Sequence, residues 1–323
     1  MTAGIHRFGP LTVAAVAAIW WGFAITVLQP ASEPPNPPAP DMSVGNNVYW
    51  VRETRWAMIV LVVLAFVWAH RGNHRRTLTV ALPAGIAWIA ADILLDRADV
   101  AGMAATAITT VVALAVVAAG AFWSASVPAA RPQQSGLLAA FCVAAVLMPA
   151  AAAIESPTDV EPALHWAGAI GGLLSLAVAL GCAVAASSTP VKVPVVAGIA
   201  VTGVLLVAAA RLASPDGQAR PFVTVATIAL LLVAGYLVAV HGPGRIGQAM
   251  VLLVCVPVVS LPLLMAGMLF TGVAASLTAL AGNAPINAAD SDVIVTALAV
   301  VVGLILGVVA VGLSRFGDNN RLT

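Results

Sequence analysis

The chain reads His70-Arg71-Gly72-Asn73-His74-Arg75-Arg76 between two long apolar runs, residues 56–69 and 78–95. This stretch, which we call the basic turn, is the densest basic cluster in the 323 residues. Basic loops stay on the cytoplasmic side of a membrane, while apolar runs of about 20 residues cross it. The pattern therefore predicts two membrane crossings joined at the basic turn, and the side of that turn sets the direction of every other crossing.

Composition extends this interpretation to the whole chain. Of all residues, 61% are hydrophobic and 8% are charged, whereas soluble domains carry about 25% charged residues. So few charges cannot cover a water-facing surface, and most of the surface must therefore face lipid or apolar protein. The net charge of +1 supplies no basic field that would attract nucleic acid, and we expect no nucleic-acid partner.

Apolar runs of spanning length recur ten times along the chain. We therefore predict an all-α integral membrane protein with one polytopic domain over residues 1–323 and no large soluble domain. The predicted spans are residues 11–28, 54–70, 78–95, 102–124, 136–154, 166–187, 194–213, 221–240, 249–270 and 293–314. Six prolines between Pro30 and Pro40 resist helix formation, so residues 29–53 are predicted to form an extracytoplasmic loop.

Arginine placement orients the spans with both termini in the cytoplasm. The loops on the inner side then hold the larger set of basic residues: Arg7, Arg71, Arg75, Arg76, Arg131, Lys192, Arg245, Arg315 and Arg321. The outer side holds Arg52, Arg55, Arg97, Arg211 and Arg220. With a composition typical of a high-GC bacterial genome, this predicts a multi-pass protein of the bacterial cytoplasmic membrane.

Asp92 is the most informative single residue because it lies inside the third predicted span. Intramembrane carboxylates are costly, and they usually face a partner or a water-filled cavity. Asp96 follows one helical turn later on the same face. By depth, we predict that Asp92, together with Asp96, pairs with Arg211 near the outer end of the seventh span. The alternative is that Asp92 reaches interfacial water and has no specific partner.

The ninth span is the second candidate for a binding site. Pro257 and Pro262 flank Ser260 within it, and each proline removes a backbone donor. We predict a kinked or broken helix there, with residues 271–281 forming an interfacial or re-entrant piece. Elsewhere, Gly168 with Gly172, and Gly303 with Gly307, form small-residue faces at which helices approach closely.

Signatures of catalysis and of cofactor binding are absent from the sequence. It contains no HExxH, no GxSxG and no CxxC, and its three cysteines all lie in apolar runs. His70 and His241 lie at the inner ends of two spans and are alternative haem or metal ligands, but no carboxylate that would orient them lies nearby in the sequence. We therefore predict no catalytic residues, no metal site and no cofactor.

The chain resembles the drug/metabolite transporter superfamily in two features, its ten predicted spans and the dipeptide Trp21-Gly22. The chain departs from that pattern, because the segment after the first span is long and proline-rich and no second Trp-Gly opens the sixth span. The resemblance implies transport, and the family is not assigned from it.

Two functions remain open at the level of the sequence. The first is a transporter or permease for a small or lipophilic solute, because many spans surround an intramembrane acid. The second is a non-catalytic scaffold or subunit of a cell-envelope complex, because polar residues at depth are few. The expected partners are the lipid bilayer and either a second membrane protein or a second copy of the chain.

Overall fold

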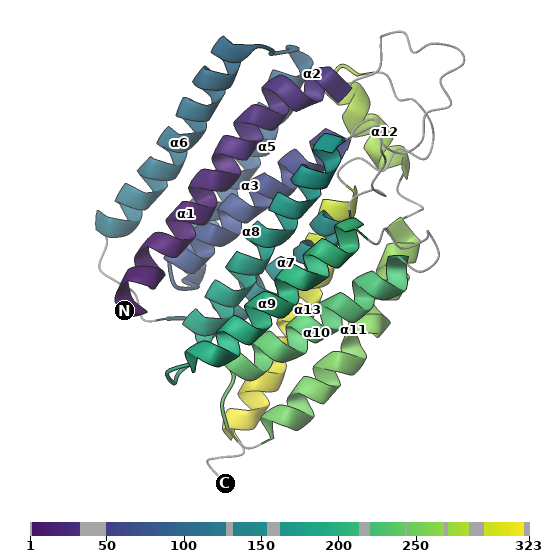
Figure 1. Cartoon of the computed structure of the whole chain (residues 1–323). Coiled ribbons are helices and arrows are strands. Elements are labelled where there is room, and N and C mark those ends of the chain that lie inside the picture. Colours follow the sequence, from purple (N-terminus) through teal and green to yellow (C-terminus); the bar gives the residue numbers. More distant parts are fainter. Residues whose placement is uncertain are drawn as a thin grey trace.

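The computed structural model describes residues 2–32, 50–126, 132–153, 162–212, 220–242, 244–267, 271–283 and 294–319. Within these ranges the chain is helical and contains no strand (Figure 1). The helices are α1 (Thr2–Phe23), η1 (Ala24–Leu28), α2 (Gln29–Ser32), α3 (Trp50–Ala69), α4 (His74–Arg76), η2 (Thr77–Ala81), α5 (Leu82–Arg97), α6 (Met103–Ser126), α7 (Gln134–Ala152), α8 (Pro162–Ala186), α9 (Val193–Leu212), α10 (Arg220–Ala239), α11 (Arg245–Gly267), α12 (Thr271–Leu280) and α13 (Ile294–Asn319).

The described part of the chain contains nine helical segments long and apolar enough to cross a membrane. Each agrees closely with one of the ten predicted spans. The tenth corresponds to α3, which is 20 residues long but carries Arg52, Glu53 and Arg55 in its first two turns. Helices satisfy their backbone hydrogen bonds internally, which is the requirement for crossing hydrocarbon. The chain is thus an all-helical, multi-pass membrane protein, as the sequence predicts.

Helix α7 lies at the centre of the bundle and packs against α8, α13, α10 and α3. It is buried on nearly all sides, which suits a helix that is apolar around its whole circumference. Glycines allow the neighbouring helices to approach it. Gly303 and Gly307 of α13 lie against Val143 and Ala139 of α7. The predicted small-residue face of α13 is therefore confirmed as a helix contact.

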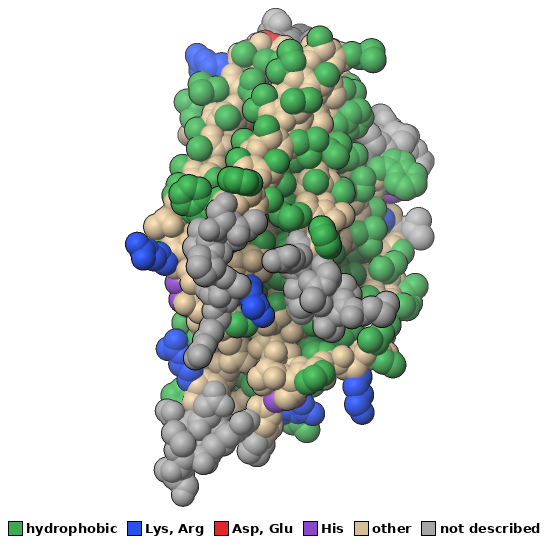
Figure 2. Space-filling view, turned by 90° about the vertical axis from the view of Figure 1, so that its left-hand side faces the viewer, with side chains coloured by type: hydrophobic (Ala, Val, Ile, Leu, Met, Phe, Trp, Pro, Cys, Tyr) green, Lys and Arg blue, Asp and Glu red, His purple; other side chains and the backbone are tan. Residues whose placement is uncertain are grey.

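The outer helices expose apolar side chains. On α6, the exposed residues include Ile108, Val111 and Val112, and α9 exposes Val201 and Leu205. Figure 2 shows the side of the molecule that faces left in Figure 1; hydrophobic side chains cover its upper part, and Lys and Arg side chains gather over its lower part. This division is the one expected for a surface that is partly in lipid and partly at a headgroup layer.

The helices run alternately up and down, so α1 begins and α13 ends at the same end of the bundle (Figure 1). The basic turn lies at that end. At the opposite end lie α2 and α12 together with the beginning of α3 and the end of α5. Chain reversal after every span therefore brings residues 50–56 of α3 beside residues 92–97 of α5.

Two expectations about individual elements need correction, and a third agrees with the structure. The predicted loop 29–53 is helical at both edges, because α2 continues the first span to Ser32 and α3 begins at Trp50; residues 33–49 lie outside the described part. Helix α11 runs without interruption through Pro257 and Pro262, so it is not broken there. The piece predicted at residues 271–281 is a separate helix, as expected: residues 271–280 form α12 at the end of the bundle.

Candidate functional site

The buried face of α5 carries both carboxylates into the bundle. Its buried residues, together with the last residue of η2, are Ala81, Gly85, Trp88, Asp92 and Asp96. They recur every three or four residues, which places them on one side of a helix. The structure therefore brings Asp92 and Asp96 together, as their spacing predicts.

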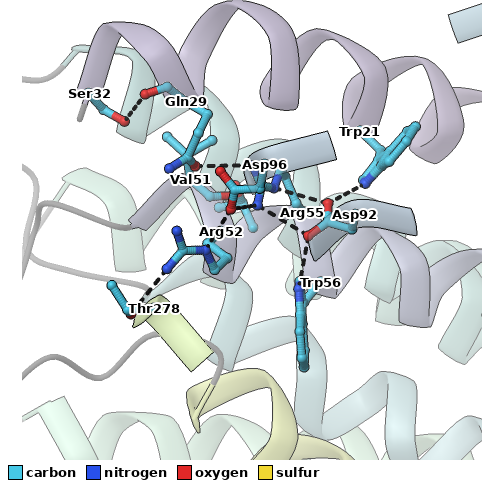
Figure 3. Close-up of polar contacts among 11 residues, drawn as sticks. Trp21, Gln29, Ser32, Val51, Arg52, Arg55, Trp56, Asp92, Asp96 and Thr278 are labelled. Atoms are coloured by element: carbon cyan, nitrogen blue, oxygen red, sulfur yellow. Dashed lines mark hydrogen bonds and ion pairs between the residues drawn. The ribbon is translucent and has the colours of Figure 1, made fainter. Parts of the chain in front are cut away.

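Two arginines from the start of α3 meet these carboxylates. Arg52 Nε donates to Asp96 Oδ2 over 2.9 Å. Arg55 Nη2 lies 2.7 Å from Asp96 Oδ2 and 3.1 Å from Asp92 Oδ2, so Arg55 bridges both acids (Figure 3). Its Nε is also 3.1 Å from Asp92 Oδ1. We call Arg52, Arg55, Asp92 and Asp96 the charge quartet; each of them is at least 96% buried.

Two tryptophans complete the contacts of Asp92. Trp21 Nε1 of α1 donates to Oδ1 over 2.7 Å, and Trp56 Nε1 of α3 donates to Oδ2 over 3.1 Å. Trp88 packs edge-on against Trp21, with ring centroids 5.3 Å apart. Both oxygens of Asp92 are thus held by donors from two helices within an aromatic surround, which excludes water and strengthens each bond.

A π-helical segment brings α1 and α2 into the site. Segment η1 interrupts the first span immediately before Gln29, whose Oε1 accepts a bond of 3.2 Å from Arg55 Nη1. A π turn inserts an extra residue and shifts the side chains that follow it, and such turns are frequent at functional sites. Gln29 is buried. The shift therefore points its side-chain amide toward Arg55, whereas a regular α-helix would point it in another direction.

Helix α12 covers the quartet at the end of the bundle. Arg52 Nη1 donates to Thr278 Oγ1 over 3.1 Å (Figure 3). At the end of α5, directly after Asp96, Arg97 Nη1 donates to the carbonyl of Leu280 over 3.0 Å. Both bonds run from arginines of the long helices to the last turn of α12, so they attach this short helix to the site.

Glu53 links the site to α13. Its Oε1 accepts a hydrogen bond from the backbone N–H of Thr296, and the hydroxyl of Thr296 donates to the carbonyl of Glu53 over 3.3 Å. Thr296 lies in the first turn of α13, where backbone donors lack helical partners and a negative charge is stabilised. Glu53 therefore caps α13.

The charge quartet is formally neutral, because two guanidinium groups oppose two carboxylates. Removing such charges from water costs several kcal/mol for each ion, and close pairing with additional hydrogen bonds offsets that cost. Here each carboxylate meets at least two donors, and Arg55 meets three acceptor side chains. The arrangement can hold its charges at depth, and neutralising one member leaves the opposite charge without compensation.

Arg211 is not the partner of Asp92. It is buried, and its Nη1 donates over 2.9 Å to the backbone carbonyl of Ala152, the last residue of α7. Its guanidinium lies against Gly168 of α8, where a side chain would collide with it. The expected Asp92–Arg211 pair is therefore corrected: Arg55 takes that place, and Arg211 joins the ends of α7, α8 and α9.

The proline-flanked candidate lies elsewhere in the molecule. Pro257, Ser260 and Pro262 are residues of α11, which packs against α10 and α13, whereas α5 packs against α3. Ser260 is buried, Pro257 is half-buried and Pro262 faces outward. The structure does not join these residues with Asp92 and Asp96 in one site.

Sequence reasoning missed Arg52, Arg55, Trp21 and Trp56 as partners of the carboxylates. Arg52 falls at the end of the predicted loop 29–53 and Arg55 at the start of the predicted span 54–70, although their spacing of three, equal to about one helical turn, places them on one helix face. That signal, read together with two acids a turn apart at the same predicted depth, was sufficient to suggest the quartet. Nothing in the sequence points to Trp21 in particular.

Among the described residues, no group of three or more His, Cys, Asp or Glu side chains is placed to hold a metal ion. Searches with models of protein families, against characterised proteins and against solved structures find no match to this chain.

Proposed function

We propose that this protein is a transporter for a small solute in the cytoplasmic membrane of a bacterium, and that the charge quartet is its switching site. The observation that carries the proposal is the complete burial of two arginines and two aspartates between membrane-long helices. Ionisable residues at such positions are costly, and they mark solute and ion pathways in membrane proteins.

The geometry supports a switch because one residue holds the site closed. Arg55 binds both carboxylates and Gln29 at once. A proton on either carboxylate, or a charged group of a solute, competes with these bonds and frees the guanidinium. The interrupted helix beside it, η1, and the short cover α12 are the elements that such a release would move.

A scaffold is the second candidate, and one observation favours it. Both oxygens of Asp92 already accept bonds from Trp21, Arg55 and Trp56. A carboxylate with so many donors also suits a permanent clamp that fixes α1, α3 and α5 to each other. The two functions differ in whether water ever reaches the quartet from both sides of the membrane.

Cysteine labelling separates the two functions. Ala24 lies in η1, is fully buried, and sits between Trp21 and Gln29, which both touch the quartet. The substitution Ala24→Cys is made in a chain whose Cys142, Cys182 and Cys255 are replaced by Ala. A charged, membrane-impermeant thiosulfonate is then added to sealed vesicles of both orientations.

Alternating access predicts that Ala24→Cys is labelled in both orientations. Ala17→Cys is the matched control, because Ala17 is equally buried and lies two turns before Ala24 on the first span, and it should remain unlabelled. A clamp predicts no labelling of either cysteine. Labelling of Ala24→Cys from one side alone contradicts alternating access and would end the transport proposal.

A further inference from the structure

The basic turn is a built structure fixed to the start of α7. The backbone N–H of Gln133 donates to the carbonyl of Arg71 over 2.9 Å, and the side-chain oxygen of Gln133 accepts from the N–H of His74 over 2.8 Å. His74 Nε2 also lies 2.9 Å from Ser135 Oγ. Three contacts therefore hold the backbone and one side chain of the turn in place.

Its backbone is held in an uncommon conformation. Arg71 has a φ of 57° and Gly72 a φ of 73°, and a positive φ is rare for any residue with a side chain. Gly72 and Gly136 meet so closely that a Cβ on Gly136 would collide with the carbonyl of Gly72. Non-glycine residues in this region persist where the surroundings enforce them, and such positions cluster at functional sites.

The turn presents positive charge at the surface. Arg71, His74 and Arg75 are exposed, and residues 70–76 contain no acid. The ion pairs of the charge quartet lie at the opposite end of the bundle. Figure 2 shows Lys, Arg and His side chains gathered over the lower part of the face that carries α6.

An exposed apolar stripe starts directly beside these charges. Leu78, Leu82 and Ile86 are 64%, 42% and 68% exposed, and they follow Arg75 at intervals of three or four residues. Residues so spaced lie on one side of a helix, which here is the side of η2 and α5 that faces away from the bundle. The surface therefore combines a cationic head with an apolar track of about two turns.

We propose that this surface, formed by Arg71, His74, Arg75, Leu78 and Leu82, binds an anionic phospholipid. The guanidinium groups of Arg71 and Arg75 bind the headgroup phosphate, since arginine forms paired, charge-assisted hydrogen bonds with phosphate oxygens. One acyl chain lies along the stripe that continues to Ile86. A soluble anion would use the arginines alone, whereas a lipid uses both parts of the surface.

Native mass spectrometry of the purified full chain tests this site with phosphatidylglycerol and phosphatidylcholine as the probes. The variant Arg71→Asn/Arg75→Gln removes both charges, and Asn tolerates a positive φ. An arginine near an anionic headgroup contributes roughly a fivefold change in affinity, so phosphatidylglycerol should bind about 25-fold more weakly to the variant, which lacks two arginines. The wild-type chain should retain phosphatidylglycerol in preference to phosphatidylcholine.

The matched control is Lys192→Gln/Arg315→Gln, which removes two exposed charges from the same end of the bundle and should leave phosphatidylglycerol binding unchanged. The variant Leu78→Ser/Leu82→Ser tests the apolar track, and it should also weaken the binding of phosphatidylglycerol. It replaces the arginine variant as the test if the arginine variant does not fold. Unchanged binding in either site variant overturns the proposal. So does equal retention of the two lipids, and displacement of phosphatidylglycerol by millimolar inorganic phosphate would identify a soluble-anion site instead.

Discussion

Arg55 is the residue on which the buried site depends, because it touches both carboxylates and Gln29. A guanidinium can do this because its donors lie in a fixed plane and point in several directions, whereas a lysine ammonium is a compact point charge. Asp92 and Asp96 therefore both depend on Arg55 for part of their charge compensation.

Replacing Asp92 by Asn should strongly destabilise the protein. The substitution keeps the size of the side chain but leaves the buried Arg55 with one carboxylate, and breaking a buried pair in this way costs roughly 3–5 kcal/mol. Reversible unfolding in mixed detergent measures the change in the free energy of unfolding. Asp99→Asn is the control, since Asp99 is exposed and its positive φ suits Asn; equal stability of the two variants would contradict the pairing.

Double-mutant cycles should distinguish the observed partner of Asp92 from the one expected by depth. Contacting residues couple by about 1–3 kcal/mol, whereas residues with no shared partner contribute additively. Asp92→Asn and Arg55→Gln should therefore show coupling in the free energy of unfolding. The effects of Asp92→Asn and Arg211→Gln on the free energy of unfolding should be additive, because Arg211 binds the carbonyl of Ala152. The reverse pattern would restore the Asp92–Arg211 pair.

At the scale of residues, the sequence predicts burial better than partnership. The spacing of Asp92 and Asp96 and the apolar residues around them are sufficient to turn both toward the bundle. The choice of Arg55 over Arg211 depends on which helices are neighbours, and periodicity within one span carries no information about neighbours. Trp21 shows the same limit, since it reaches Asp92 from a helix 71 residues earlier in the chain.

At the scale of elements, glycine at the contact of α7 and α13 sets how closely these helices pack. A Cβ on Gly303 would collide with the backbone of Val143, while a Cβ on Gly312 of the same helix would meet nothing within 4 Å. Gly303→Ala should therefore cost about 1–3 kcal/mol of stability. Gly312→Ala should be neutral or stabilising by up to about 1 kcal/mol. Thermal unfolding in detergent compares the two, and equal losses would contradict the close contact.

The helix boundaries agree with the predicted ones where a polar residue ends the apolar run. The prediction fails at α3 and α11 for opposite reasons. At α3, charged residues suggest a loop, but Arg52 and Glu53 lie in the helix because each finds a buried partner. At α11, two prolines suggest a break. The helix nevertheless continues through Pro257 and Pro262, although each proline lacks a backbone N–H, because neighbouring groups can satisfy the freed carbonyls in membrane helices.

At the scale of the whole molecule, alternation of the spans places the basic turn and the α5–α6 turn at opposite ends. Cysteines introduced at Arg75 and at Asp99, both exposed, should therefore react with an impermeant maleimide from opposite sides of the membrane. Because basic loops stay in the cytoplasm, Asp99→Cys should react in intact cells, and Arg75→Cys should react after permeabilisation. Labelling of Arg75→Cys in intact cells would invert the orientation.

The balance of the charge quartet decides how the membrane voltage acts on it. Moving one elementary charge across the full bilayer against a voltage of 100 mV requires about 2.3 kcal/mol. With Arg52 and Arg55 opposed by Asp92 and Asp96, the net electrical force on the four groups taken together is zero, and the resting potential of a cell does not move the quartet as a unit. A proton on Asp92 would leave one positive charge in excess, and only then would the electric field begin to drive the site.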